Sequence, residues 1–212
     1  MKNVTRKNKP TSLENNSSRW KRELLTELAK PQGARDNKKV TNIGRRYAQD
    51  DVREILNQMY NGLCCYCESR ISPASFEHIE HRAPKSKFPE LTFEWNNLHL
   101  SCSVCNIKKL NKWDSKNEIL DSVDDEINGH LQYLGPHIDN LTERGYTTIQ
   151  HANLNRDELL DARTEILAEV IKVLDEIKGL PNTRKAKHES ELNKMVNEQY
   201  GSIVQHLMDN YN

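Results

Sequence analysis

Residues 95–109 read WNNLHLSCSVCNIKK. An apolar segment, LHLS, ends here at Cys102, and Cys105 follows after two intervening residues. A second pair with the same gap, Cys64 and Cys67, lies earlier in the chain, with 34 residues between the pairs. Two thiolates on a tight turn supply half of a tetrahedral zinc site, with zinc–sulfur bonds of about 2.3 Å, and a second pair completes it. The two pairs therefore predict one structural zinc ion bound by four cysteines.

Such an ion would close the intervening chain and supply stabilisation that a small apolar core lacks. The alternative is four buried, reduced cysteines, which requires both spacings to be accidental. The fifth cysteine, Cys65, does not fit the two-residue gap, so we expect a free or packing thiol. A closed four-thiolate site has no open coordination position, so catalysis must come from polar groups that the zinc positions. The candidates are Glu77, His78, Glu80, His81, Asn96, Asn97, His99 and Asn106.

Composition limits the rest of the molecule. Of the 212 residues, 35% are hydrophobic and 29% are charged, which predicts modest packed units rather than one large core. Lys plus Arg and Asp plus Glu both number 31, but residues 1–49 hold 13 of the cations and only four acids. This asymmetry permits nucleic-acid contact through the amino-terminal part, and a solvated basic arm is the alternative.

No apolar run approaches the roughly 18 residues of a membrane span, and the first residues, MKNVTRKNKPTS, lack the apolar core of a signal peptide. We therefore expect a cytoplasmic protein without membrane contact. Disulfides are not expected in that compartment.

The predicted fold class is α+β and mostly α-helical, with a central zinc-stabilised finger between amino-terminal helices and a carboxy-terminal helical hairpin. We expect a basic, poorly ordered arm at 1–16, a helical region at 17–62, the finger at 63–113, an acidic linker with short elements at 114–154, and the hairpin at 155–212.

Local signals place the individual elements. Ser17 or Ser18 is expected to cap a first helix, and Asp50 or Asp51 a second one that Asn61-Gly62 ends. TTIQ at 147–150 is expected to form a short strand. The hairpin turns at Pro181-Asn182, and its apolar stripe is core or, alternatively, a partner interface.

Three motifs together resemble a known family. CCYC (64–67), IEHRAPK (79–85) and the WNNLHLSCSVCNIKK stretch resemble the HNH endonucleases that carry a zinc-stapled ββα-metal finger. More loosely, DDVREILNQMYNGLCCYCESR (50–70) and TTIQHANLNRDELLDAR (147–163) resemble the PtuB-type proteins of Septu and some retron anti-phage systems. Those proteins are encoded beside an SMC-like or ABC-type (PtuA-like) ATPase.

The resemblance implies roles by position. His81 corresponds to the general base, and a neutral imidazole near its ordinary pKa of about 6.5 can take a proton from water. Glu80 and Asn106 correspond to ligands of a catalytic Mg²⁺ or Mn²⁺ ion. Asn97 corresponds to the residue that fixes the finger's loop and orients His81, with Asn96 as its rival. The acid is Glu where commoner patterns have Asp, so its side chain is one methylene longer.

Further residues are assigned with their alternatives. Arg82, Lys85, Lys108 and Lys109 would hold flanking phosphates, although each could be a solvated surface cation. His78 would be a supporting ligand or substrate contact, or alternatively a histidine at the surface or at the edge of the core. His99, within LHL, is expected to be structural.

The leading hypothesis is therefore a metal-dependent HNH endonuclease that docks on an ATPase through its helical flanks. We expect DNA as its substrate, with RNA such as tRNA as the alternative. The competing hypotheses are a non-catalytic zinc module that binds nucleic acid or protein, and an assembly adaptor that uses the carboxy-terminal hairpin.

Overall fold

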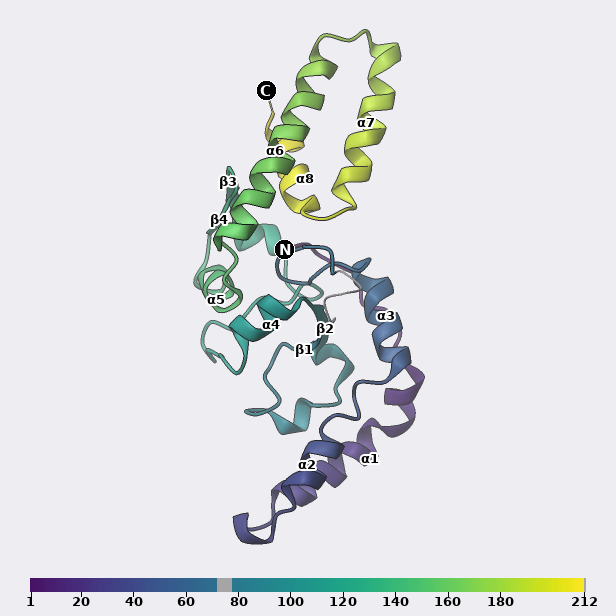
Figure 1. Cartoon of the computed structure of the whole chain (residues 1–212), viewed down its shortest axis with the longest axis vertical. Coiled ribbons are helices and arrows are strands. Elements are labelled where there is room, and N and C mark those ends of the chain that lie inside the picture. Colours follow the sequence, from purple (N-terminus) through teal and green to yellow (C-terminus); the bar gives the residue numbers. More distant parts are fainter. Residues whose placement is uncertain (72–77, 212) are drawn as a thin grey trace.

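The computed structural model describes residues 1–71 and 78–211, without the side chains of residues 182 and 183. The molecule is elongated (Figure 1), with the cysteine-rich finger in the middle. Helices α1 (Thr11–Leu28) and α2 (Asn37–Ile43) lie at one end, and helices α6 (Asp157–Lys178) and α7 (Asn182–Val196) lie at the other. The predicted mixed architecture, mostly helical with small sheets and clustered cysteines, is confirmed.

The ends of two helices in the amino-terminal region are fixed by identifiable residues. Helix α1 covers Thr11–Leu28, and α3 covers Asp50–Tyr60. Asp51 accepts hydrogen bonds from the Ser12 backbone N–H (2.8 Å) and hydroxyl (2.7 Å), so it caps the start of α1 rather than its own helix. The first helix therefore begins before Ser17, which is buried inside it. As predicted, α3 ends at Asn61, which adopts the left-handed conformation with φ 52°.

The expected poorly ordered arm is replaced by a segment that packs along the finger. The Val4 N–H donates to the Ser122 carbonyl at 2.8 Å, and the Arg6 guanidinium donates to the Leu98 carbonyl at 2.7 Å. Val4 also packs against the main hydrophobic core. Charged residues of the segment therefore have partners far away in the sequence, which a local reading of composition does not reveal. A short helix, α2 (Asn37–Ile43), then packs on α1.

The finger consists of two short antiparallel strands and a helix. Strand β1 (His78–His81) pairs with β2 (Leu98–Ser101), and Glu80 lies opposite His99. Helix α4 (Ser103–Lys109) follows β2 directly. The order of strand, strand and helix is the one that the resemblance implied.

After the finger, the prediction of a strand at 147–150 was wrong. The strands instead form a hairpin, β3 (Leu131–Leu134) and β4 (His137–Asn140), and TTIQ lies in helix α5 (Glu143–Ala152). Thr142 caps α5, since its hydroxyl accepts from the Gly145 N–H at 3.2 Å. Thr148 is accommodated because its hydroxyl donates to the Arg144 carbonyl within the helix at 2.8 Å.

The carboxy-terminal hairpin is confirmed, with one correction. Helix α6 (Asp157–Lys178) turns at Pro181 into α7 (Asn182–Val196), and a third helix, α8 (Gly201–Asn210), folds back between them. The single second helix expected from the apolar pattern is broken at Tyr200, which has φ 58°. At Gly201 an added Cβ would lie 1.9 Å from the Val196 carbonyl oxygen, so this close turn requires glycine.

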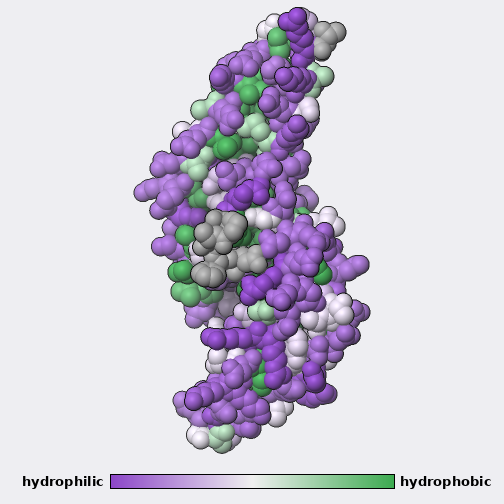
Figure 2. All heavy atoms as spheres, turned by 45° about the vertical axis from the view of Figure 1, so that its right-hand side comes forward, coloured by the Kyte–Doolittle hydropathy of each residue, from purple (hydrophilic) through white to green (hydrophobic). Residues whose placement is uncertain are grey.

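Two hydrophobic clusters hold these parts. The larger extends from α1 and α3 through the finger to α5 and the start of α6. The smaller lies between the last three helices and centres on Val170, Leu192 and Val204. The face drawn in Figure 2 is largely hydrophilic, as the composition predicts. Among the described residues, no helix combines the length and apolar character needed to cross a membrane.

Candidate functional site

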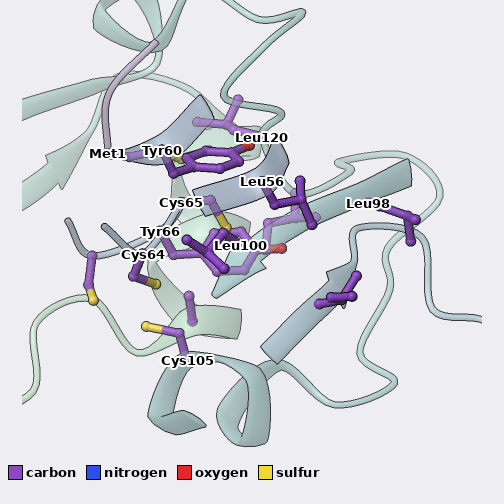
Figure 3. Close-up of a cluster of buried hydrophobic side chains, with 14 of the residues drawn as sticks. Met1, Leu56, Tyr60, Cys64, Cys65, Tyr66, Leu98, Leu100, Cys105 and Leu120 are labelled. Carbon is purple, nitrogen blue, oxygen red and sulfur yellow. The ribbon is translucent and has the colours of Figure 1, made fainter. Parts of the chain in front are cut away.

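The four cysteines of the two pairs converge at one point. Their Sγ atoms all lie within 4.8 Å of one another, and those of Cys67 and Cys102 are 3.8 Å apart. Tetrahedral coordination with zinc–sulfur bonds of about 2.3 Å places the sulfurs roughly 3.8 Å apart. In Figure 3 the sulfurs of Cys64 and Cys105 point toward each other from opposite sides of the group. The donor set and its spacing therefore fit a zinc ion.

Each pair is held by its own turn. In the first, the Glu68 N–H donates to the Cys64 carbonyl at 3.0 Å. In the second, Cys102 caps helix α4, and its Sγ accepts from the Cys105 N–H at 3.4 Å. Arg156, at the start of α6, brings a guanidinium to 3.5 Å from the Cys105 Sγ. This cation offsets the negative charge that four thiolates would concentrate around a divalent ion.

Cys65 is not part of this group. Its backbone N–H donates to the Leu100 carbonyl at 2.8 Å, and its side chain lies in the core beside Tyr66 and Leu100 (Figure 3). Burial raises the pKa of the Cys65 thiol well above its ordinary value, so the group stays protonated. The structure thus places it as a packing residue.

Four of the eight candidate residues line one cleft of about 580 Å³. His78, Glu80 and His81 enter it from strand β1, and Asn106 from helix α4. Strand β1 ends at His81, so the alternation of side chains along the strand does not keep Glu80 and His81 out of the same cleft. Of the candidates, Glu77 lies outside the described residues.

Glu80 is buried and carries an unexpected partner. Its Oε1 lies 2.6 Å from the Lys109 ammonium and 3.5 Å from the Tyr66 hydroxyl. Burial raises the pKa of Glu80 to about 7, against the opposing effect of Lys109. Lys109 also donates to the His81 carbonyl at 2.9 Å and has no exposed surface. The prediction that Lys109 contacts phosphates was therefore wrong: it lies inside the finger and neutralises Glu80.

His81 is held in one tautomer. Its Nε2 lies 3.0 Å from the Thr92 carbonyl oxygen, which only accepts hydrogen bonds, so Nε2 carries the proton and Nδ1 is left as an acceptor. The Tyr47 ring packs edge-on against it, with ring centroids 4.5 Å apart. Burial lowers the pKa of His81 to about 3, so the expectation of a value near 6.5 was wrong. The imidazole is neutral throughout the physiological range.

Asn97 fastens the loop that follows β1. Its side-chain oxygen accepts from the Ala83 N–H at 2.7 Å, and its amide donates to the carbonyls of Ala83 (3.0 Å) and Leu91 (3.2 Å). Asn96 is exposed and offers only its carbonyl, to Arg6. Of the two rivals, Asn97 therefore has the geometry of a residue that fixes the loop.

The other three residues predicted to contact phosphates, Arg82, Lys85 and Lys108, have different surroundings in the structure. Arg82 is engaged within the protein, because its guanidinium donates to the Ile119 carbonyl at 2.9 Å and pairs with Asp121 at 3.4 Å. Lys85 lines the cleft. Lys108 is exposed but lines a different depression, beside Arg156. Of the four, Lys85 is the one that lines the cleft of the catalytic candidates.

A divalent cation would find hard oxygen donors here, which are the ligands that Mg²⁺ prefers. They are a Glu80 carboxylate and the Asn106 amide, with the His78 imidazole nearby on the same cleft. Within the described part of the chain, only the cysteine group brings three or more His, Cys, Asp or Glu ligands together. Glu80 and Asn106, with His78 beside them, are the residues that would hold such a cation.

Sequence reasoning missed several neighbours of the site. Tyr47 and Tyr66 contact His81 and Glu80, yet neither stands in a pattern that marks it. Arg53, in α3, also lines the cleft. His99 is buried against the Tyr60 hydroxyl, 2.6 Å from its Nδ1, which agrees with a structural role.

Comparison with known proteins agrees with this geometry. Residues 64–112 match the family model described as HNH endonuclease. The chain is 27% identical over 195 residues to the Septu protein PtuB of Bacillus mycoides (strain KBAB4), covering 74% of this chain and 66% of that one. It is 30% identical over 128 residues to the Septu protein PtuB of Bacillus thuringiensis, covering 59% and 50%. The resemblance to an HNH nuclease of the PtuB type is confirmed, although the chain spans only about two thirds and half of these relatives' lengths.

Proposed function

We propose that this protein is a metal-dependent endonuclease that hydrolyses phosphodiester bonds in nucleic acid as the nuclease of an anti-phage complex. One observation carries the proposal: within a segment that matches HNH endonucleases, Glu80, His81 and Asn106 meet in a single cleft. A purely structural zinc module requires none of these three.

The proton transfer belongs to His81. A water molecule in the cleft attacks the phosphorus and gives its proton to Nδ1, the ring nitrogen that Thr92 leaves free. The P–O3′ bond breaks, and the leaving oxygen takes a proton from solvent. The products are a 5′-phosphate and a 3′-hydroxyl. Because burial disfavours the imidazolium, His81 is unprotonated and available as a base, but it is a weaker base than an exposed histidine.

Glu80 and Asn106 would hold the Mg²⁺ or Mn²⁺ ion, which when bound supplies positive charge to the scissile phosphate and to the leaving oxygen. Lys109 competes for the Glu80 carboxylate at Oε1, and no contact of Oε2 is found among the described residues. A single carboxylate already paired with an ammonium predicts weak metal binding in the absence of substrate. Asn97 holds the loop in place, so that the Thr92 carbonyl stays within hydrogen-bonding distance of His81.

For partners, we propose an SMC-like or ABC-type ATPase, as the resemblance to Septu and retron systems implies. The helical flanks, α6 to α8 in particular, project from the finger and offer the surface for such docking. DNA is the proposed substrate. RNA such as tRNA remains the alternative, because the finger's candidate residues would contact the phosphate backbone, which both nucleic acids share.

The test is incubation of plasmid DNA and of total RNA with the protein, alone and with its neighbouring ATPase, in Mg²⁺, in Mn²⁺ and in EDTA. We expect cleavage with either metal and none in EDTA, with products that carry 5′-phosphate and 3′-hydroxyl ends. Products with 2′,3′-cyclic phosphate ends, or no cleavage under any condition, contradict the proposal.

A further inference from the structure

A second groove adjoins the cleft and is not used by the chemistry above. It has a volume of about 570 Å³ and lies between helices α1 and α2 and the loop at 85–92. Its lining is largely apolar, from Leu24, Leu28, Val40 and Pro89. A groove with an apolar floor suits a flat apolar group of the size of a nucleobase.

The charge of this groove has one sign. Its lining includes Arg35, Arg45 and Lys85 and no acidic residue. Arg35 is held by the carbonyls of Leu28 and Lys30, and its Nε has no hydrogen-bond partner within the described chain. Arg45 is exposed. Part of the excess of basic residues in the amino-terminal sequence thus lines a concave surface, and the positive charge of that surface attracts phosphates.

The groove and the catalytic cleft adjoin each other. Lys85 and Ser86 line both of them. The Lys85 ammonium donates to the Gly44 carbonyl at 3.3 Å and to the Tyr47 hydroxyl at 3.2 Å, and it lies over the Tyr47 ring. These contacts fix a positive charge at the junction, where the phosphate next to the scissile one would pass.

We propose that this groove binds an unpaired nucleotide of the substrate strand beside the cleavage point, with its base on the apolar floor and its phosphate at Arg45 and Lys85. In a regular duplex the bases are stacked and paired, and their apolar faces cannot reach such a surface. The inference rests on the proposed function and specifies its substrate: a single strand, a loop or a distorted duplex rather than regular double helix.

Two variants with matched controls test this. Thr41 is exposed on α2 and lines the groove, so Thr41→Trp fills it without removing a core contact, whereas Asn42→Trp places the same ring on the adjacent exposed position outside the lining. Arg45→Ala removes a cation of the groove, and Lys38→Ala removes an exposed cation of α2 that does not line it.

Fluorescence anisotropy in EDTA measures binding of a single strand, a hairpin loop and a duplex of one sequence to the full chain. We expect the unpaired forms to bind at least about tenfold more tightly than the duplex. Thr41→Trp and Arg45→Ala should weaken binding of the unpaired forms about tenfold, and both controls should leave it unchanged. Equal affinity for all three nucleic acids, or equal effects of Thr41→Trp and Asn42→Trp, overturns the inference.

An abasic substitution separates the base from the backbone. Removing one base at the bound position should reproduce the loss seen with Thr41→Trp, and no effect at any position overturns the placement of a base in the groove. The proposed function can fail separately. If the wild type and Thr41→Trp cut regular duplex at the same rate and unpaired strands no better, the nuclease stands and the groove inference falls. If binding behaves as expected but nothing is cut, the nuclease proposal falls.

Discussion

At the scale of single residues, Asn97 offers a clear prediction. Its side chain makes three hydrogen bonds to the backbone at Ala83 and Leu91, at 2.7, 3.0 and 3.2 Å. Asn97→Ala leaves these buried groups without partners and should lower the free energy of unfolding by roughly 1–3 kcal/mol. It should also slow cleavage, because the loop carries Thr92, which holds His81. Urea denaturation and a cleavage assay measure both effects, with Asn96→Ala as the exposed control; equal effects of the two contradict the role.

Lys109 gives a second prediction, because its neighbour serves as control. Lys109 is fully buried and pairs with Glu80 at 2.6 Å, whereas Lys108 is exposed. Lys109→Met leaves a buried carboxylate without its partner and should cost roughly 3–5 kcal/mol of stability. Lys108→Met should change stability by less than about 0.5 kcal/mol. Urea denaturation of both variants measures the difference, and a loss below 1 kcal/mol for Lys109→Met (about that of an exposed pair) would show that the pair is not structural.

At the scale of elements, Glu27 fastens α2 to the end of α1. Its carboxylate accepts from the Lys30 ammonium at 2.8 Å and from the Asp36 N–H at 3.0 Å, and it pairs with Lys39 at 3.3 Å. The hydrogen bond from Lys30, followed by that from Asp36, lowers the pKa of Glu27 to about 2 from the ordinary 4.5. A lowered pKa in the folded state stabilises at pH values above the unfolded pKa, and this contribution is lost as the pH falls toward 2.

Glu27→Gln should therefore lower the melting temperature at pH 7, have a smaller effect at pH 3 and have a much smaller one near pH 2. Thermal unfolding of both proteins, followed by circular dichroism, measures the difference. Glu23→Gln is the control, since the pair of Glu23 with Arg46 is more than a third exposed and contributes little. A difference between wild type and Glu27→Gln that is independent of pH contradicts the assignment.

The cysteine pairs make the corresponding prediction for the finger. Cys105→Ser removes one zinc ligand and should reduce bound zinc from one ion per chain to well below one, with loss of the fold around residues 64–105. Cys65→Ser, at a buried cysteine outside the group, should keep the zinc. Elemental analysis measures the ratio. A wild-type value well below one, or a full complement in Cys105→Ser, would refute the four-cysteine site.

The same elements show what sequence reasoning can reach. The cysteine pairs and the apolar stripe of α3 were predictable, because both depend on spacing within short segments. Lys109 was misassigned because adjacent helical residues face directions about 100° apart, and the sequence does not show which one faces the core. TTIQ was misassigned because its helix depends on a cap at Thr142 and on burial against distant segments.

At the scale of the whole molecule, the group of four cysteines lies where distant parts of the chain meet. Arg156 of α6 reaches Cys105, and the Tyr200 hydroxyl lies 3.0 Å from the Ser69 hydroxyl, just after the first cysteine pair. The amino-terminal segment joins the same region, where the Met1 ammonium pairs with Glu68, the residue after Cys67. The finger thus connects the two helical ends.

The central claim is that the protein hydrolyses phosphodiester bonds in the cleft beside the four cysteines, with His81 as the general base. The most direct measurement is the cleavage rate of zinc-loaded wild type against His81→Ala, with His137→Ala, an exposed histidine on β4, as control. We predict a fall of roughly 10²–10⁴-fold for His81→Ala at unchanged zinc content, and no change for His137→Ala. Equal rates for wild type and His81→Ala would contradict the account.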